Sequence, residues 1–168
     1  MQPLIETLLS IEDLEHRPAI QIAHAGSLML SKYQMPNPED LDALLRHQQA
    51  VAKQHDGKIS VLSLVHLQGN VGKISDEIRK KTVEVIKELS PICIGSATVI
   101  LGTGLSSTMA RMFLTGFYLV SKPPFPQKAF SSVAEALAWV QQLPGQTSDP
   151  RRLNSSMIIK HFGLTGVR

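Results

Sequence analysis

The stretch that most constrains the fold runs from Ser96 to Val140. It begins with SATVILG, an apolar and β-branched run that is typical of a buried strand. The glycine-containing TGLSST follows, and then the long apolar run MARMFLTGFYLVS, which is typical of a helix. The proline turn KPPFPQ, a short KAF strand and the helix SSVAEALAWV complete the stretch. This order of elements predicts the closing half of a small α/β domain.

Composition restricts the class of protein. The chain has 168 residues, of which 43% are hydrophobic and 18% charged, as in one globular domain with extensions. Its net charge of +3 is carried by scattered basic residues, so we expect no nucleic-acid partner. Cys93 is the only cysteine, which excludes an internal disulfide and a cysteine metal cluster.

The N-terminal half predicts a helix, a hairpin and two helix–strand units. Apolar spacing over residues 3–15 is helical and Pro18 ends it, while Ala25-Gly26 is a turn signal between two short strands. The expected elements are a helix at 3–15, strands at 19–24 and 27–33, a helix starting after Asn37, a strand at 58–67, and a helix starting after Ser75.

Helix ends are well marked. Asn37 precedes Pro38 and lies three residues before Asp40, close to a capping box, and Gly57 suits a left-handed helix terminus. Ser132 and Glu135 form a full capping box for the last core helix. In the tail, either Asn154 or Ser155 caps a short helix that Gly163 stops.

These elements predict a single α/β domain. It has a mixed, mostly parallel sheet of about five strands and four core helices, with the hairpin as an antiparallel edge. We expect residues 1–18 to form an N-terminal helical extension, residues 19–144 to form the α/β domain, and residues 145–168 to be a linker and C-terminal tail.

Four motifs of the closing half carry a resemblance to a known family. They are Ala110-Arg111-Met112-Phe113, the prolines of Pro123–Pro126, Phe130, and Ala136-Leu137-Ala138-Trp139. Together with the order of elements they resemble the STAS domain of bacterial anti-sigma-factor antagonists, and more narrowly the divergent STAS/SEC14-like bacterial proteins. The likeness covers about Ala19 to Leu143. It implies a STAS-like fold and a regulatory or protein-binding role.

One departure from that family concerns a regulatory serine. The classical antagonists carry a phosphorylated serine in a D-S-S-G-like loop after the third strand. Here the loop His66–Ser75 lacks that motif, and Ser75 is the nearest match in position. Ser75 is either a plain helix cap or a phosphorylation site. A helix N-terminus would accept the phosphate, whereas the adjacent Asp76 and Glu77 would oppose it.

The loop that follows the Ser96–Gly102 strand is a candidate small-ligand site. It joins a strand to a helix N-terminus, where free amides attract anions. The sequence lacks the Gly-Lys-Ser/Thr of a phosphate-binding Walker loop, so a tight turn with a serine cap is the competing interpretation. The residues concerned are Gly102, Thr103, Gly104, Ser106 and Ser107.

No catalytic or metal-binding set is visible in the sequence. The six histidines, at 16, 24, 47, 55, 66 and 161, make no H-x-x-x-H or H-E-x-x-H pair. No serine stands in G-x-S-x-G. We therefore expect a protein that is not an enzyme and uses no metal or cofactor.

Apolar residues outside the core pattern suggest contacts with a partner or with a second copy. The Ser106–Val120 helix is apolar almost all round, and the tail places apolar side chains after a polar linker. The candidate interaction residues are Phe113, Phe117, Tyr118, Ile158 and Phe162. At least one extension is expected to dock on the core or across a subunit interface, beside the Ser106–Val120 helix.

The sequence thus favours a non-enzymatic regulatory or protein-interaction module that is oligomeric through its extensions. The alternative is a sensor that binds a small anionic or lipid-like ligand at the glycine loop. No basic segment precedes an apolar core at the N-terminus, and no apolar run approaches the roughly 20 residues of a membrane span. A cytoplasmic location with no membrane span is expected.

Overall fold

The computed structural model describes residues 9–34, 36–66, 75–102 and 123–164. Within them, six strands form one sheet in the order β1-β2-β3-β4-β5-β6. The strands are β1 (Glu12–Arg17), β2 (Ile20–Ala25), β3 (Leu28–Tyr33), β4 (Ile59–His66), β5 (Cys93–Leu101) and β6 (Gln127–Phe130). The helices are α1 (Pro38–Gln54), α2 (Asp76–Leu89), α4 (Val133–Gln141) and α5 (Ser155–His161), with the 3₁₀ helix η2 (Asp149–Arg152).

The sheet changes from antiparallel to parallel along its width. β1, β2 and β3 pair antiparallel, whereas β3, β4, β5 and β6 pair parallel. This is the mixed, mostly parallel α/β fold that the alternating elements predict. β5 lies between β4 and β6, so the expectation that its apolar run is an interior strand is confirmed.

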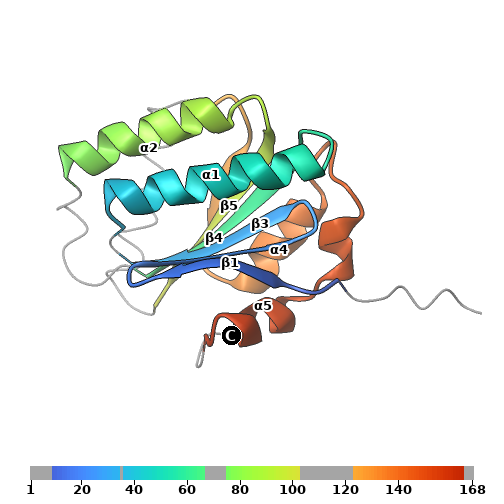
Figure 1. Cartoon of the computed structure of the whole chain (residues 1–168). Helices are drawn as coiled ribbons and strands as arrows, with labels where there is room; N and C mark the ends of the chain where they lie inside the picture. Colours follow the sequence, from blue (N-terminus) through green and yellow to red (C-terminus); the bar gives the residue numbers. More distant parts are fainter. Residues whose placement is uncertain (1–8, 35, 67–74, 103–122, 165–168) are drawn as a thin grey trace, which may run out of the picture.

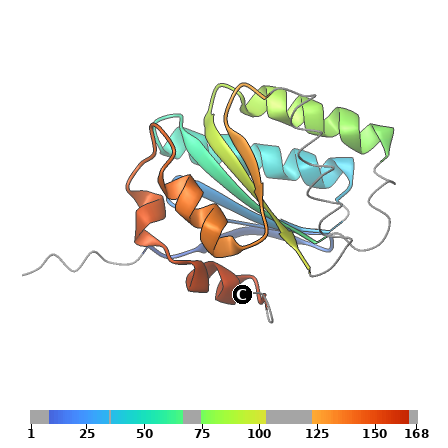
Figure 2. The ribbon, with the colours of Figure 1, turned by 180° about the vertical axis from the view of Figure 1, so that it is seen from behind.

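Helices cover both faces of the sheet (Figure 1). α1 and α2 lie on one face, and α4, η2 and α5 lie on the other, as the reverse view confirms (Figure 2). Each face has its own apolar core: Ile22, Met29 and Val61 point toward α1, and Leu30, Leu62 and Val99 point toward α4 and α5. Alternation of side chains along each strand produces these two cores.

The predicted caps are present. Asn37 Oδ1 accepts a hydrogen bond from the Asp40 amide at 2.8 Å, and Asp40 Oδ2 accepts one from the Asn37 amide at 2.9 Å. The hydroxyl of Ser132 accepts a bond from the Glu135 amide at 3.1 Å, but among the described residues the Glu135 side chain does not bond back to the Ser132 amide, so the full capping box expected there is only a cap. Gly57 ends α1 with φ of +74°, the left-handed conformation expected there.

The N-terminal helix expected at residues 3–15 is wrong over the described part of that segment. Residues 12–17 form β1, which pairs with β2 as the antiparallel edge of the sheet and brings the strand number to six instead of five. The register shifts at Leu14, where two steps along β1 oppose one step along β2. The expected helix rested mainly on the spacing of Leu4, Leu8 and Ile11, of which only Ile11 lies in the described residues. The bulge also breaks the strict alternation by which a strand is recognised.

The C-terminal tail docks on this chain's own core. α5 is capped by Asn154, whose Oδ1 accepts a bond from the Met157 amide at 3.0 Å. Ile158 is 0% exposed and packs in the core below the sheet together with Phe162. The expected docking of an extension is therefore confirmed for the tail. Its expected position beside the Ser106–Val120 helix lies outside the described residues.

Candidate functional site

The glycine loop begins where β5 ends. Gly102 adopts φ of +113°, a conformation that L side chains rarely adopt, so glycine is required at this exit from the strand. Thr103, Gly104, Ser106 and Ser107 lie outside the described residues. So do the candidate interaction residues Phe113, Phe117 and Tyr118.

The edge from which this loop leaves gathers other polar groups. β3, β4 and β5 run parallel, so their carboxyl ends share one edge of the sheet, and α1 and α2 begin at that edge (Figure 1). Ligands of open α/β sheets commonly bind outside this edge. At the end of β4, His66 Nδ1 is buried and has no hydrogen-bond partner among the described residues.

A row of hydroxyl groups crosses the sheet below that edge. Ser31, Ser63 and Thr98 occupy paired positions on β3, β4 and β5, and all three are buried. Ser31 Oγ donates to Ser63 Oγ at 3.2 Å. By strand alternation they face α1 and α2, on the side opposite to Leu30 and Leu62. The row therefore places polar groups in the largely apolar layer between the sheet and these two helices. Hydroxyls can both donate and accept hydrogen bonds.

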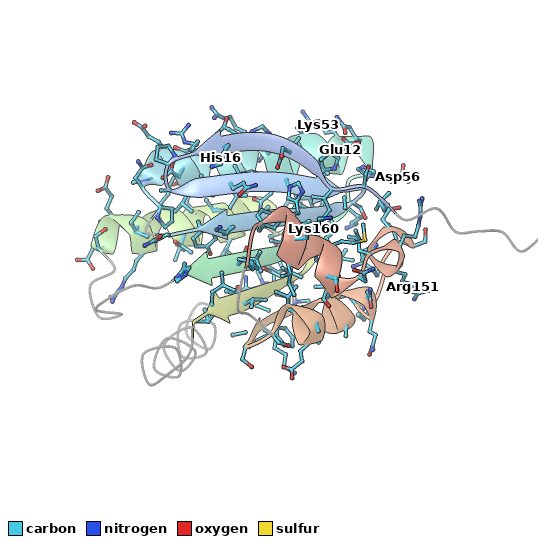
Figure 3. All side chains as sticks on the ribbon, turned by 90° about the horizontal axis from the view of Figure 1, so that it is seen from below. Glu12, His16, Lys53, Asp56, Arg151 and Lys160 are labelled. Atoms are coloured by element: carbon cyan, nitrogen blue, oxygen red, sulfur yellow. The ribbon has the colours of Figure 1, made fainter. Side chains whose placement is uncertain are left out.

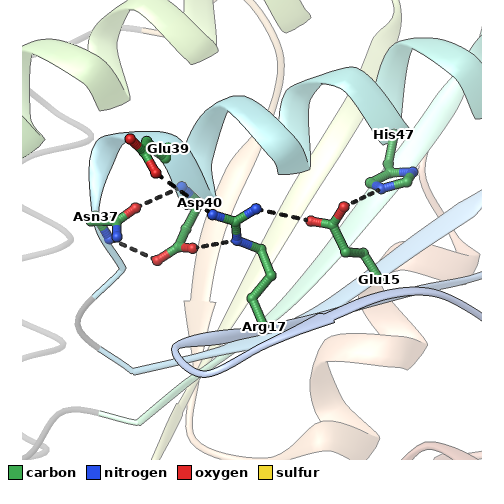
Figure 4. Close-up of polar contacts among 6 residues, drawn as sticks. All are labelled: Glu15, Arg17, Asn37, Glu39, Asp40 and His47. Atoms are coloured by element: carbon green, nitrogen blue, oxygen red, sulfur yellow. Dashed lines mark hydrogen bonds and ion pairs between the residues drawn. The ribbon is translucent and has the colours of Figure 1, made fainter.

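The N-terminus of α1 is occupied by the chain's own carboxylate. The Asp40 side chain is only 4% exposed, and its second oxygen accepts a bond from Arg17 Nε at 2.7 Å (Figure 4). The carboxylate oxygens of Asp40 thus pair with the Asn37 amide and with a guanidinium. An anionic ligand would have to displace Asp40 from this helix terminus.

Arg17 joins β1 to α1 through more than one partner. Its Nη1 lies 3.6 Å from Glu15 Oε2, and its Nη2 lies 3.9 Å from Glu39 Oε2 (Figure 4). On the other side of Glu15, His47 Nε2 lies 3.6 Å from Oε1. Asp40 raises the pKa of Arg17 through their hydrogen bond. The arrangement holds an edge strand to a helix.

Ser75 caps α2 and is exposed. Its Oγ accepts a hydrogen bond from the Ile78 amide at 3.2 Å, and Asp76 and Glu77 are exposed in the first turn. The sequence offers two interpretations of Ser75, a plain helix cap and a phosphorylation site. The cap is present, and the hydroxyl is on the surface.

The two candidate interaction residues of the tail are not on the surface. Ile158 and Phe162 are both buried against the chain's own sheet and α4. Lys32 Nζ of β3 donates to the Phe162 carbonyl at 3.0 Å, which holds the end of α5 against the sheet. In this arrangement neither side chain offers apolar surface to another molecule.

The described residues offer little support for a reactive cysteine or for a metal site. Burial raises the pKa of Cys93 to about 12, so its thiol stays protonated and unreactive. Across residues 9–34, 36–66, 75–102 and 123–164, no three His, Cys, Asp or Glu side chains come together as ligands for a metal ion. In those same ranges no helix combines the length and the apolar character needed to cross a membrane.

Sequence reasoning missed the contacts of β1. Arg17 and Asp40 are 23 residues apart, and Asp13 and His161 are 148 apart. No spacing within a helix or strand indicates such pairs. The charged run EDLEHR, in which three acids precede a histidine and an arginine, was the one available signal.

Comparison with known proteins adds no relative. Neither models of known families, nor curated proteins, nor solved structures match the chain.

Proposed function

We propose that the chain is a non-enzymatic STAS-like module that regulates through protein contacts in the bacterial cytoplasm, alone or as an oligomer. The observation that carries the proposal is the exposed N-terminal turn of α2. It is the next described element after β4, and its cap Ser75 places at the surface a hydroxyl that accepts a hydrogen bond from the Ile78 amide. In the antagonists that the sequence resembles, the serine read by the partner protein follows the corresponding strand. The proposed contact surface is therefore the first two turns of α2.

Site-specific photo-crosslinking tests this surface. A benzophenone side chain replaces Lys80, which is exposed near the start of α2, and in a matched control it replaces Gln54, exposed at the end of α1. We expect the Lys80 position to give one discrete protein adduct in cell extract and the Gln54 position to give none. Adducts of equal yield from both positions, or from neither, contradict the proposal. The absence of turnover in hydrolase, phosphatase and kinase panels is expected as well.

The enzymatic alternative has its own test. A reproducible activity that is lost when Ser75, Ser106 or His66 is changed to alanine would show that the chain is an enzyme. Parallel assays of His55→Ala, which alters a partly buried histidine away from the carboxyl edge, control for loss of fold.

A small-ligand sensor is the second candidate function. It is favoured by Gly102, whose left-handed conformation lies at the carboxyl edge of the sheet, and by the buried Ser31 and Ser63 hydroxyls below it. Native mass spectrometry of the purified chain should then show a co-bound anionic or lipid-like molecule. Gly102→Ala should reduce its occupancy, whereas Gly57→Ala, at another left-handed glycine, should not.

A further inference from the structure

The edge strand β1 is connected to three other elements by pairs of a carboxylate and an imidazole. Glu12 Oε2 lies 3.4 Å from His24 Nε2 on β2. Asp13 Oδ1 lies 2.8 Å from His161 Nε2 on α5. Glu15 Oε1 lies 3.6 Å from His47 Nε2 on α1. Every acidic residue of β1 therefore has a histidine partner, and the three partners come from three elements.

The bulge at Leu14 makes this arrangement possible. Asp13 opposes Ala23, which faces the α4 and α5 side, whereas Glu15 opposes Ile22, which faces the α1 side. Residues two apart in a regular strand would share a face. Because the bulge adds one residue, β1 directs one acid to the helix below the sheet and the next to the helix above it. Figure 3 views the sheet from the α5 side, with Glu12 and His16 labelled on β1.

The three histidines are partly shielded from water. Their side chains are 12% (His24), 26% (His47) and 21% (His161) exposed. Shielding of this degree strengthens a charge pair relative to one in free water. An edge strand can open locally while the rest of the sheet stays folded. Modest changes in the contacts of the strand therefore alter the fraction of molecules in which it is open.

Other charged groups face the same three pairs. Glu15 also lies near Arg17, which contacts Glu39 and Asp40 of α1. Asp13 has His16 and Gln21 beside it. His24 Nδ1 lies 3.0 Å from the carbonyl of Gly26. Arg17 is charged at every pH of interest, and histidine is the residue type in this set whose side chain is suited to respond to pH near neutrality.

We propose that the three imidazole–carboxylate pairs form a proton-dependent clamp that holds β1 on the sheet, closed more firmly near pH 6 than near pH 8. An imidazolium attracts each carboxylate, and a neutral imidazole retains at most a hydrogen bond. As pH rises, the clamp loses up to three charge pairs while the β1–β2 backbone ladder persists. β1 then opens more often and exposes the backbone edge of β2.

Amide hydrogen exchange of the full chain measures this opening. Protection factors, which correct for the intrinsic dependence of exchange on pH, are compared at about pH 6 and pH 8. We expect protection of the β1 amides to fall roughly tenfold, a size consistent with three partly exposed pairs that contribute a few-fold each. Amides of β4, in the middle of the sheet, should keep their protection.

Removing the carboxylates identifies the cause. The variant Glu12→Gln/Asp13→Asn/Glu15→Gln keeps side-chain size, and it should show β1 protection that no longer depends on pH over this range. His55→Gln, which removes a partly buried imidazole that lies beside Asp149 and outside the three pairs, should keep the wild-type dependence. If the triple variant does not fold, Asp13→Asn alone, at a side chain that is 63% exposed, should remove part of the dependence.

Two results overturn the proposal. One is a wild-type β1 whose protection is the same at both pH values. The other is a fall in protection that persists undiminished in the carboxylate variants, because another titration would then open the strand. Imidazole titration followed by NMR in the same samples shows in each case whether His24, His47 and His161 changed charge over the range.

Discussion

Asp13 and Glu15 stand two residues apart on β1 and face opposite sides of the sheet. Asp13 reaches His161 of α5, and Glu15 reaches Arg17 and, across the gap to α1, His47. The bulged Leu14 between them points into the core below α1. One extra residue thus turns an edge strand into a connection between the two helical layers.

Asp13 gives a prediction about pH. The hydrogen bond with His161 holds the pKa of Asp13 below its usual range. A carboxyl with a lowered folded pKa stabilises the fold above its unfolded pKa, and that contribution is lost as pH falls through the folded pKa. Asp13→Asn should therefore lower the free energy of unfolding by at most about 1 kcal/mol at pH 5–6. Urea titrations should show the difference vanish near pH 3.

Arg17 gives a prediction about a buried charge. Arg17→Ala leaves the Asp40 carboxylate, which is 4% exposed, without its cation. Loss of the cation leaves the buried carboxylate with one partner fewer, so Arg17→Ala should lower the free energy of unfolding more than a substitution at an exposed position does. The control is Glu39→Ala, at a side chain that is 84% exposed, where we expect a change within about 0.5 kcal/mol. Equal effects in chemical denaturation would show that Asp40 does not depend on Arg17.

Local signals in the sequence were sufficient for the helices and the inner strands. Asn37, Ser75, Ser132 and Asn154 each cap the helix that follows, as their spacing predicts. Capping depends on residues within one turn, which is why a single sequence reveals it. β5 was equally clear, because a strand covered on both faces is apolar at successive positions.

β1 and its contacts could not be obtained in this way. The bulge interrupts the alternation by which a strand is recognised, since Asp13 faces the α5 side and both Leu14 and Glu15 face the α1 side. The histidine partners of the β1 acids are His24, His47 and His161, which come from three elements that meet only in the folded chain. The tail shows the same limit. Its apolar residues were recognised, but only the structure places Ile158 and Phe162 inside this chain's own core.

Cys93 gives a prediction about reactivity. Burial raises the pKa of its thiol to about 12, so less than about one part in a thousand is thiolate at pH 8. We expect a disulfide reagent such as dithionitrobenzoate to leave Cys93 unmodified for hours in the native chain and to react within minutes in guanidinium chloride. Rapid reaction of Cys93 in the native chain would show that the structure around the start of β5 opens readily.

The tail gives a prediction about stability. Phe162→Ala empties a buried site between α5 and the sheet, which costs about 3–5 kcal/mol of the free energy of unfolding. Lys160→Ala, at an exposed position of the same helix, should change it by less than about 0.5 kcal/mol. Deleting residues 147–168 should lower the melting temperature and expose apolar surface. A truncated chain that keeps both its melting temperature and its mass by light scattering would rule out this role for the tail.

Gly26 gives the sharpest prediction, because a side chain there meets the tail directly. It adopts φ of +56° in the β2–β3 turn, and an added Cβ would clash with the side chain of Asp149. That carboxylate accepts a hydrogen bond from the Ser27 amide at 3.0 Å, and it also lies 3.9 Å from His55 Nδ1. Gly26→Ala must therefore strain the turn and displace Asp149 together.

A matched glycine separates the two effects. Gly57→Ala has similar strain, with φ of +74°, but its Cβ would meet nothing within 4 Å. We expect it to cost about 1–2 kcal/mol of the free energy of unfolding. Gly26→Ala should cost about 2 kcal/mol more, since it also removes a charge-assisted hydrogen bond. In the Asp149→Gly background, which lacks every side-chain atom that the added Cβ would meet, the clash is absent, so Gly26→Ala should cost no more than Gly57→Ala. Urea unfolding of the four variants measures this coupling, and additive costs would contradict the contact.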